Sequence, residues 1–160
     1  MATAHVCSNG KRTILSSIYL DILADHENFF PPRFYDLVDH CNNQNIPLVL
    51  ALDSNAHSCL WGKETNRRGK LLEDVIASYG LNVENIGISP TFEARQTSTV
   101  IDITLTLQSP SILNWQVSTE ATLSDHNAIR YELELCPEPP CLVPNLAKAC
   151  LLYTSDAADE

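Results

Sequence analysis

Positive charge is scarce in this sequence of 160 residues. Lysine and arginine together number 10 against 20 aspartates and glutamates, so the formal net charge is -10. Such a chain has no general electrostatic attraction for nucleic acid, because the phosphate backbone repels it. A bound divalent cation can reverse the sign of the field locally. We therefore expect any contact with DNA to be local and helped by a metal ion, with basic residues drawn from Arg67, Arg68, Lys70 and Arg95.

Long apolar runs and closely spaced cysteine pairs are also missing. No stretch is long and apolar enough to span a bilayer, although an apolar share of 44% is sufficient for a hydrophobic core. The six cysteines are scattered without a Cys-x-x-Cys pair, which argues against a zinc site or a thioredoxin-like motif. The first residues lack the pattern of a secretory signal, so we expect reduced thiols rather than disulfides. At this length the chain is one domain or a part of one.

The first half of the sequence predicts a hairpin, a helix and a buried strand. Residues Thr3–Tyr19 read as two strands joined at Asn9-Gly10, a pair that favours tight turns. A helix is expected to begin at Pro31-Pro32 and to end in the asparagine-rich residues 42–45. The continuously apolar stretch Ile46–Leu52 predicts a strand that is buried on both faces.

The second half predicts another helix and then a series of short strands. The helix covers Arg67–Tyr79, with Asn66 as its N-cap and Gly80 as the residue that stops it. A polar loop at residues 94–99 would join two of the strands as a hairpin. The strands themselves are expected at Leu81–Asn85, Thr91–Glu93, Val100–Leu107, Trp115–Ser118 and Ala128–Leu135.

The C-terminal residues differ in kind from the rest of the chain. Residues 137–149 contain several prolines and read as an exit segment from a domain that covers residues 1–136. Residues 150–160 show no periodicity and correspond to the translation of a synthetic sequencing adapter. We expect these last residues to be an artefact without fixed structure. The alternative is an ordinary acidic tail.

Two polar clusters beside apolar strands carry the functional signal. Asp53-Ser54-Asn55-Ala56-His57 directly follows one strand, and Ser124-Asp125-His126 directly precedes another. A third carboxylate, Asp102, lies inside an apolar strand pattern, where a charge needs a partner. His126 is the natural candidate for that partner. Because strands hold such side chains rigidly, the clusters predict a site that binds a hard metal ion and cleaves phosphate esters.

Each of these residues also has a structural interpretation. Asp53 could cap the segment after its strand, Asp102 could form a structural ion pair, and His126 alone could be a histidine of the core. Taken together in this order, the three favour a functional reading. For four other residues a role in packing or support is at least as common as a catalytic one: Tyr19, His57, Trp61 and Phe92.

The motifs, in this order, resemble the endonuclease/exonuclease/phosphatase superfamily, and most closely the endonuclease domains of non-LTR retrotransposons. The resemblance covers about residues 11–135 and is carried by Ser16–Tyr19, Leu50–Gly62, Asn66–Gly69, Ser89–Phe92, Ile101–Leu105 and Leu123–His126. It implies an α/β fold, a four-layer α/β sandwich like that of DNase I, incomplete at its N-terminus. It also implies a DNA substrate, Mg²⁺ or Mn²⁺ as cofactor, a reverse transcriptase domain in the parent polyprotein, and an intracellular, nuclear location for the parent element.

The resemblance assigns catalytic roles residue by residue. Asp53 corresponds to the aspartate that activates the attacking water or protonates the leaving group, and Asn55 to the asparagine that holds the scissile phosphate. Tyr19 corresponds to a tyrosine that contacts the phosphate. His126 corresponds to the catalytic histidine and Asp102 to the carboxylate that orients it.

The same resemblance suggests where metal and DNA would bind. Asp125 corresponds to a metal-binding aspartate, and Asp53 offers a second carboxylate within plausible reach. Mg²⁺ prefers oxygen ligands and keeps several waters, so two protein carboxylates are sufficient. DNA contacts are expected at Asn66, Arg67, Arg68, Arg95 and Thr97, the last two in the polar loop.

The sequence departs from the family pattern at one point. Family members carry an asparagine and a metal-binding glutamate on strands that precede the tyrosine, whereas no glutamate precedes Tyr19 here. We therefore expect a domain without its N-terminal part, which nicks DNA poorly or not at all as it stands. Three alternatives stay open at this point: a catalytically dead remnant, an apurinic-site endonuclease, and a phosphoesterase that acts on a small substrate.

Overall fold

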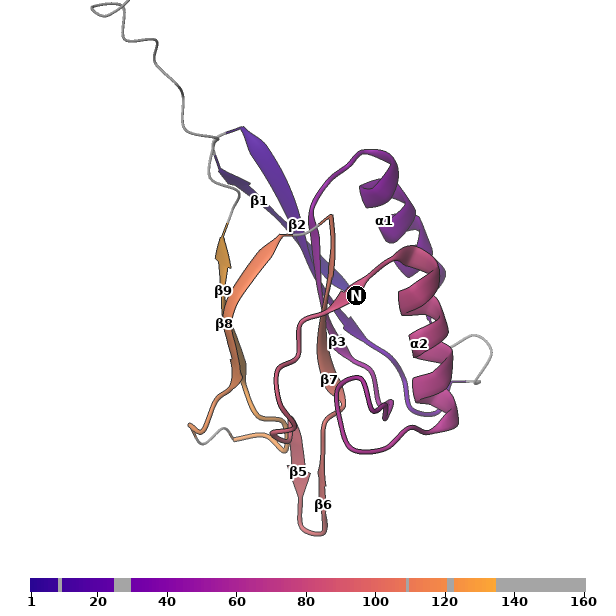
Figure 1. Cartoon of the computed structure of the whole chain (residues 1–160), viewed down its shortest axis with the longest axis vertical. Coiled ribbons are helices and arrows are strands. Elements are labelled where there is room, and N and C mark those ends of the chain that lie inside the picture. Colours follow the sequence, from indigo (N-terminus) through magenta and orange to yellow (C-terminus); the bar gives the residue numbers. More distant parts are fainter. Residues whose placement is uncertain (9, 25–29, 109, 121–122, 135–160) are drawn as a thin grey trace, which may run out of the picture.

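A five-stranded mixed sheet forms the centre of the structure (Figure 1). The computed structural model describes residues 1–8, 10–24, 30–108, 110–120 and 123–134. The strand order is β1-β2-β3-β7-β4, in which β2 and β3 are parallel and the other neighbours are antiparallel. The bounds of these strands are Ala2–Ser8 for β1, Lys11–Tyr19 for β2, Leu48–Asp53 for β3, Asn82–Val83 for β4 and Asp102–Leu107 for β7.

Two helices cover one face of this sheet (Figure 1). The helix α1 spans Pro32–Asn43, and α2 spans Arg67–Tyr79. The backbone N–H of Gly69 donates to the side chain of Asn66, the N-cap of α2, and the helix ends at Gly80 in the left-handed conformation, with φ 63°. Both helices therefore begin and end where the sequence predicts, because proline, asparagine and glycine suit those positions.

The hydrophobic core lies between the helices and the sheet. Alternate residues of the central strands point toward the helices, since successive side chains of a strand lie on opposite faces. Burial of each such aliphatic side chain contributes about 1.5–3 kcal/mol. The core is made by Ile14 and Ile18 of β2, Leu48, Leu50 and Leu52 of β3, Ile103 and Leu105 of β7, and Phe34, Val38, Cys41, Leu72 and Ile76 of the helices. It fixes the strand ends that carry the polar clusters.

Two further pairs of strands complete the described structure. The antiparallel ribbon of β8 (Ser111–Val117) and β9 (Ile129–Glu134) lies on the side of the sheet opposite the helices (Figure 1). The indole N–H of Trp115 joins the ribbon to the sheet by donating to Thr104 Oγ1 at 3.0 Å. The hairpin of β5 (Phe92–Ala94) and β6 (Thr97–Thr99) projects beyond the end of the sheet (Figure 1).

The structure confirms the α/β class and corrects three local predictions. The polar loop predicted at residues 94–99 is a hairpin with a two-residue turn, because Ala94 and Thr97 already pair. Asp102 is the first residue of β7, not an interior residue of a longer strand. Ala51 of β3 is exposed, so that strand is not buried on both faces. The reason is an open hollow of ≈ 300 Å³ between this part of the sheet and the ribbon, lined also by Tyr131.

The remaining predictions concern the ends, the thiols and the membrane. The exit segment, the residues assigned to a sequencing adapter, and Asn9 of the first turn lie outside the described residues. Within the described residues, Cys7, Cys41 and Cys59 are free thiols. None of the helices that the structure describes combines the length and the apolar character needed to cross a bilayer.

Candidate active site

Three of the predicted site residues stand in one row across the central sheet. Tyr19 ends β2 and is the register partner of Asp53 on β3, which in turn is the register partner of Asp102 on β7. Register partners on neighbouring strands project to the same face, with Cα atoms roughly 4.5–5.5 Å apart. All three line a hollow of ≈ 290 Å³ on the face that carries the ribbon. The register of the sheet therefore brings together residues that are far apart in the sequence.

His126 joins this row from the loop that precedes β9. Its Nδ1 lies 2.9 Å from Oδ2 and 3.2 Å from Oδ1 of Asp102. Its Nε2 lies 3.9 Å from Oδ2 of Asp53. The predicted hydrogen bond between His126 and Asp102 is thus confirmed. The carboxylate of Asp102 accepts a hydrogen bond from Nδ1–H, which orients the ring and leaves Nε2 toward Asp53.

Asp53 lies between Asp102 and Tyr19 at the end of β3. Its side chain is 23% exposed, and its Oδ1 atom is buried with no hydrogen-bonding partner among the described residues. Burial raises the pKa of Asp53, and the negative charge of Asp102 raises it further. His126, the backbone amide of Asn55 and Arg68 act in the opposite direction. A carboxyl group with raised proton affinity suits a residue that must accept a proton and later release it.

Asn55 follows Asp53 in a left-handed backbone conformation, with φ 48°. Asparagine adopts this conformation more readily than most residues, which explains its place in the turn. Its side-chain amide donates to the carbonyl oxygen of Leu20 at 3.1 Å, so the side chain is anchored to the chain just beyond β2. The predicted contact between Asn55 and the scissile phosphate stays a prediction.

The N-terminus of α2 holds the loop that carries Asp53 and Asn55. Arg68 is only 4% exposed, and its Nε donates to the carbonyl oxygen of Ser54 at 2.9 Å. Its Nη2 donates at 3.0 Å to the carbonyl oxygen of Leu20, which also accepts from Asn55. Arg68 is thus turned into the fold in this structure, and its predicted contact with DNA stays a prediction. The guanidinium group binds the two backbone segments that position the cluster.

Asn66 and Gly69 complete the attachment of this loop to α2. The Oδ1 atom of Asn66 accepts from the backbone N–H of Gly69 at 2.7 Å and from that of His57 at 3.3 Å. A Cβ atom on Gly69 would lie 1.6 Å from the carbonyl oxygen of His57, so only glycine allows this approach. Asn66 therefore has a capping role that the sequence also predicts, while its contact with DNA stays a prediction.

The other predicted residues lie outside the row. Asp125 is exposed, and its backbone oxygen accepts from the N–H of Glu93 at 2.7 Å. Arg67 is exposed at the start of α2, and Arg95 and Thr97 are exposed in the β5–β6 hairpin. Their roles in metal and DNA binding stay predictions.

The base of the β5–β6 hairpin supports the cluster in a way that sequence reasoning missed. Thr91 Oγ1 accepts from the backbone N–H groups of Ile101 and Asp102 at 3.0 and 2.9 Å. The ring of Phe92 meets the imidazole of His126 edge to face, with centroids 5.0 Å apart. Asn127 donates to the carbonyl oxygen of Pro90 at 3.0 Å. The segment that contains Thr91 and Phe92 did carry the family resemblance, whereas nothing in the sequence singled out Asn127.

The cluster also contains donor atoms for a divalent cation. One ligand atom each from Asp53, Asp102 and His126 lie within 4.8 Å of one another, and among the described residues no other group of this kind occurs. Asp125 does not belong to this group. The unpartnered Oδ1 of Asp53 fits a hard cation, since such ions prefer carboxylate oxygens and complete their shells with water. The residues present are thus compatible with a bound metal ion.

Comparison with known proteins agrees with this geometry. The sequence model of the endonuclease–reverse transcriptase family matches residues 14–130. No curated protein sequence matches the chain. The endonuclease domain of TRAS1, a telomere-specific non-LTR retrotransposon, is 24% identical with a TM-score of 0.69, over 82% of this chain and 62% of that domain.

Two other solved structures share the fold. A mannosyl-6-phosphatase from Bacteroides thetaiotaomicron is 17% identical with a TM-score of 0.57, over 79% of this chain and 52% of the phosphatase. An endonuclease/exonuclease/phosphatase family protein from the same organism is 14% identical with a TM-score of 0.51, over 82% of this chain and 54% of its own length. This chain spans less than two thirds of each of these three structures. The chain belongs to the endonuclease–reverse transcriptase family and has the endonuclease/exonuclease/phosphatase fold of a non-LTR retrotransposon endonuclease.

Proposed function

We propose that this chain is the catalytic part of an endonuclease that nicks DNA for a non-LTR retrotransposon. The observation that supports this most directly is the Asp102–His126–Asp53 arrangement at the ends of β7 and β3. It combines an oriented imidazole with a neighbouring carboxyl group of raised pKa, which lines the hollow together with Tyr19 and Asp102. Hydrolysis of a phosphodiester requires such a set: a proton acceptor for water, donors to the phosphate oxygens, and a group that protonates the leaving oxygen.

Each residue has a defined part in the proposed reaction. Asp53 accepts the proton of the attacking water as that water forms a bond to phosphorus; the P–O bond to the leaving oxygen breaks, and that oxygen takes up a proton from solvent. In its imidazolium form, in which both ring nitrogens carry a proton, His126 donates from Nδ1 to Asp102 and from Nε2 to a phosphate oxygen, and Asp102 keeps the ring in the required orientation. Tyr19, which is 60% exposed at the end of β2 beside Asp53, and Asn55, two residues after Asp53, contact the phosphate.

The proposed cofactor is Mg²⁺ or Mn²⁺, and Asp53 would hold it; Asp125, the other predicted ligand, lies outside the group of side chains that could share an ion in this structure. A bound divalent ion neutralises phosphate charge and lowers the pKa of water, two effects worth several kcal/mol in related chemistry. The family match supports a divalent metal, and the unpartnered Oδ1 of Asp53 supplies a donor. We further propose that the parent polyprotein contains a reverse transcriptase and acts in the nucleus.

We propose that the 160-residue chain nicks DNA weakly on its own. The group that could hold a metal includes Asp53 but excludes Asp125. A metal ion with few protein ligands is poorly oriented, and supporting ligands commonly change affinity or activity by 10–100-fold.

A plasmid-nicking assay tests this proposal. The 160-residue chain and a version extended upstream by the family's preceding strands are incubated with supercoiled plasmid and Mg²⁺. We expect weak conversion to the open circle by the chain, strong conversion by the extended version, and loss of conversion by His126→Ala and Asp53→Ala in the extended version. Lys11→Gln, at the opposite end of β2, serves as the control and keeps full activity. Nicking that survives both active-site substitutions would refute the proposed function.

A further inference from the structure

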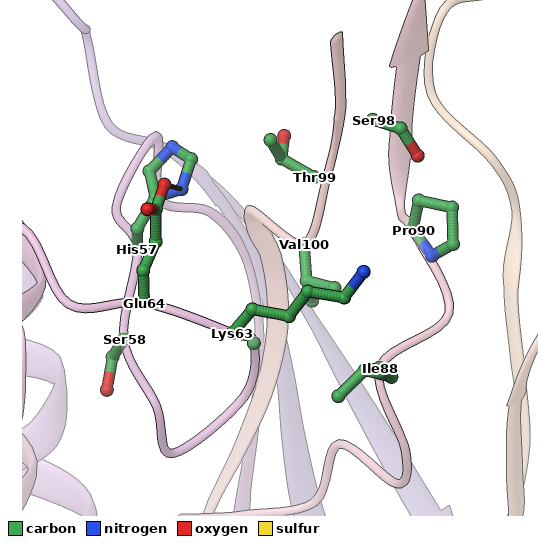
Figure 2. A pocket seen from close by; sticks show the side chains of 10 residues that line it. His57, Ser58, Lys63, Glu64, Ile88, Pro90, Ser98, Thr99 and Val100 are labelled. Carbon is green, nitrogen blue, oxygen red and sulfur yellow. Dashed lines mark ion pairs between the residues drawn. The ribbon is translucent and has the colours of Figure 1, made fainter.

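A second pocket lies beside the catalytic cluster, between the loop of residues 57–64 and the β5–β6 hairpin (Figure 2). Its volume is ≈ 270 Å³. Lys63 and Glu64 line it from the loop, and Pro90, Ser98 and Thr99 line it from the hairpin and its approach. We call it the loop–hairpin pocket. It shares no residue with the hollow that contains Asp53 and Asp102.

The lining of the loop–hairpin pocket combines one cation with an apolar wall. The side chain of Lys63 extends past Val100 toward Pro90, so its ammonium group points into the pocket (Figure 2). Lys63 forms no ion pair within the described residues. The hydroxyl groups of Ser98 and Thr99 offer additional donors on the opposite side. A concave site with a few convergent polar groups over an apolar wall is the usual form of a ligand site.

The acidic residue of this pocket, Glu64, directs its carboxylate away from the ammonium group of Lys63 and toward His57 (Figure 2). Glu64 lies beside His57, with Oε1 3.6 Å from Nδ1, and its side chain is 79% exposed (Figure 2). Solvent screens an exposed carboxylate strongly. The ammonium group of Lys63 is therefore the charged group that a ligand would meet at its end of the pocket, and it suits an anionic group.

Short segments connect the walls of this pocket to the catalytic residues. His57 follows Asn55 by two positions, and Val100 precedes Asp102 by two positions. Two residues span at most about 7 Å of chain. One strand of a DNA duplex carries a phosphate for each roughly 3.4 Å of the helix axis. A strand with one phosphodiester in the catalytic row therefore passes the loop–hairpin pocket within a few nucleotides of the cut.

We propose that the loop–hairpin pocket binds one nucleotide of the DNA strand that is cut. Lys63 binds its backbone phosphate as a point charge, helped by the Ser98 and Thr99 hydroxyls, and Val100 and Pro90 contact its deoxyribose. The contact sets the register of the strand on the enzyme. The inference rests on the proposed function, since it takes DNA as the substrate.

A salt-dependent binding experiment tests this role of Lys63. The 160-residue chain is titrated against a fluorescent DNA duplex without Mg²⁺ at several salt concentrations, together with Lys63→Gln and Lys11→Gln. Loss of one phosphate contact lowers the slope of log K against log salt by about 0.9, which corresponds to about eightfold weaker binding near 0.1 M salt. We expect this change for Lys63→Gln and none for Lys11→Gln, which removes the same charge at the far end of β2. Equal binding by the two variants, or no binding of the duplex by the unsubstituted chain, would overturn the proposal.

A second measurement locates the phosphate. Duplexes that carry a single uncharged methylphosphonate at successive positions of one strand are bound to the chain and to Lys63→Gln. At one position, the methylphosphonate should weaken binding by the unsubstituted chain but not by Lys63→Gln. If affinity depends on the methylphosphonate position in the same way for both proteins, the contact between Lys63 and a phosphate is contradicted. Glu64→Gln should bind the unmodified duplex more tightly. Neither measurement needs nicking, so the results can be interpreted even where the catalytic proposal fails. If the chain nicks DNA but Lys63→Gln binds the duplex as tightly as the unsubstituted chain, only the proposed role of the loop–hairpin pocket is refuted.

Discussion

Replacement of Arg68 by alanine should lower the free energy of unfolding of this chain substantially. The same replacement of its neighbour Arg67 should have little effect. The Arg68 guanidinium is buried and donates to the backbone carbonyls of Ser54 and Leu20. Alanine leaves both acceptors in a buried site without their charged donor. Arg67 is exposed, so its replacement removes only solvated atoms.

The magnitude follows from these two hydrogen bonds. A bond to a charged group contributes about 1.5–3 kcal/mol, and the packing of the aliphatic stem adds to this. We therefore expect Arg68→Ala to lower the free energy of unfolding by about 3–5 kcal/mol, against a total of about 5–15 kcal/mol for an ordinary domain. With an m-value near 2 kcal/mol/M, the urea midpoint falls by roughly 1.5–2.5 M.

Urea denaturation followed by circular dichroism measures the effect. Arg67→Ala should stay within about 0.5 kcal/mol of the unsubstituted chain. Where Arg68→Ala fails to fold, Arg68→Lys provides the measurement, because lysine keeps the charge but loses the planar fork that reaches two carbonyls. The loss in free energy of unfolding for Arg68→Lys should be about half of that for Arg68→Ala. A change below about 1 kcal/mol for Arg68→Ala, or equal losses at positions 67 and 68, would refute the assigned role.

Three further predictions concern the same region. Gly69→Ala should destabilise the chain by at least about 3 kcal/mol, since its Cβ would overlap the carbonyl oxygen of His57, and a melt that matches the unsubstituted chain would contradict the close approach. Asp53→Asn should raise the free energy of unfolding at pH 7 by about 1 kcal/mol, because it removes a buried carboxylate with an unpartnered oxygen. The pKa of Asp53 is raised in the folded state, so charged Asp53 opposes folding above that pKa, and the gain should vanish as pH falls toward the unfolded value of about 3.9. Asp102→Asn should lower plasmid nicking by the extended version about 100-fold or more with little change in its melting temperature, and a rate within a factor of three would exclude an orienting role toward His126.

The elements of the fold were largely predictable because local chemistry decides them. Proline before α1, Asn66 and Gly80 around α2, and the apolar stretch of β3 act over a few residues. The pairing of Asp102 with His126 was also predictable, since a carboxylate at an apolar strand requires a partner. These inferences need no knowledge of the tertiary structure.

The sequence could not reveal which polar residues turn inward. Arg67 and Arg68 are adjacent and chemically identical, yet only Arg68 lies on the buried side of α2. That difference depends on the angle at which the helix meets the loop after β3, and tertiary packing sets this angle. Asp125 and His126 present the same difficulty, because adjacent residues point in different directions and only His126 faces Asp53.

The β5–β6 hairpin is fixed to the candidate site at its base and exposed at its tip. Its base is bonded to the catalytic region through Thr91, through the ring of Phe92 and through the backbone of Glu93. Its tip, at Arg95 and Gln96, is exposed and lies beyond all of these contacts. The position of Asp102 and His126 therefore depends on the base of the hairpin and not on its tip. Substitutions at Arg95 and Gln96 should leave the Asp102–His126 hydrogen bond intact, whereas substitutions at Thr91 or Phe92 should disturb it.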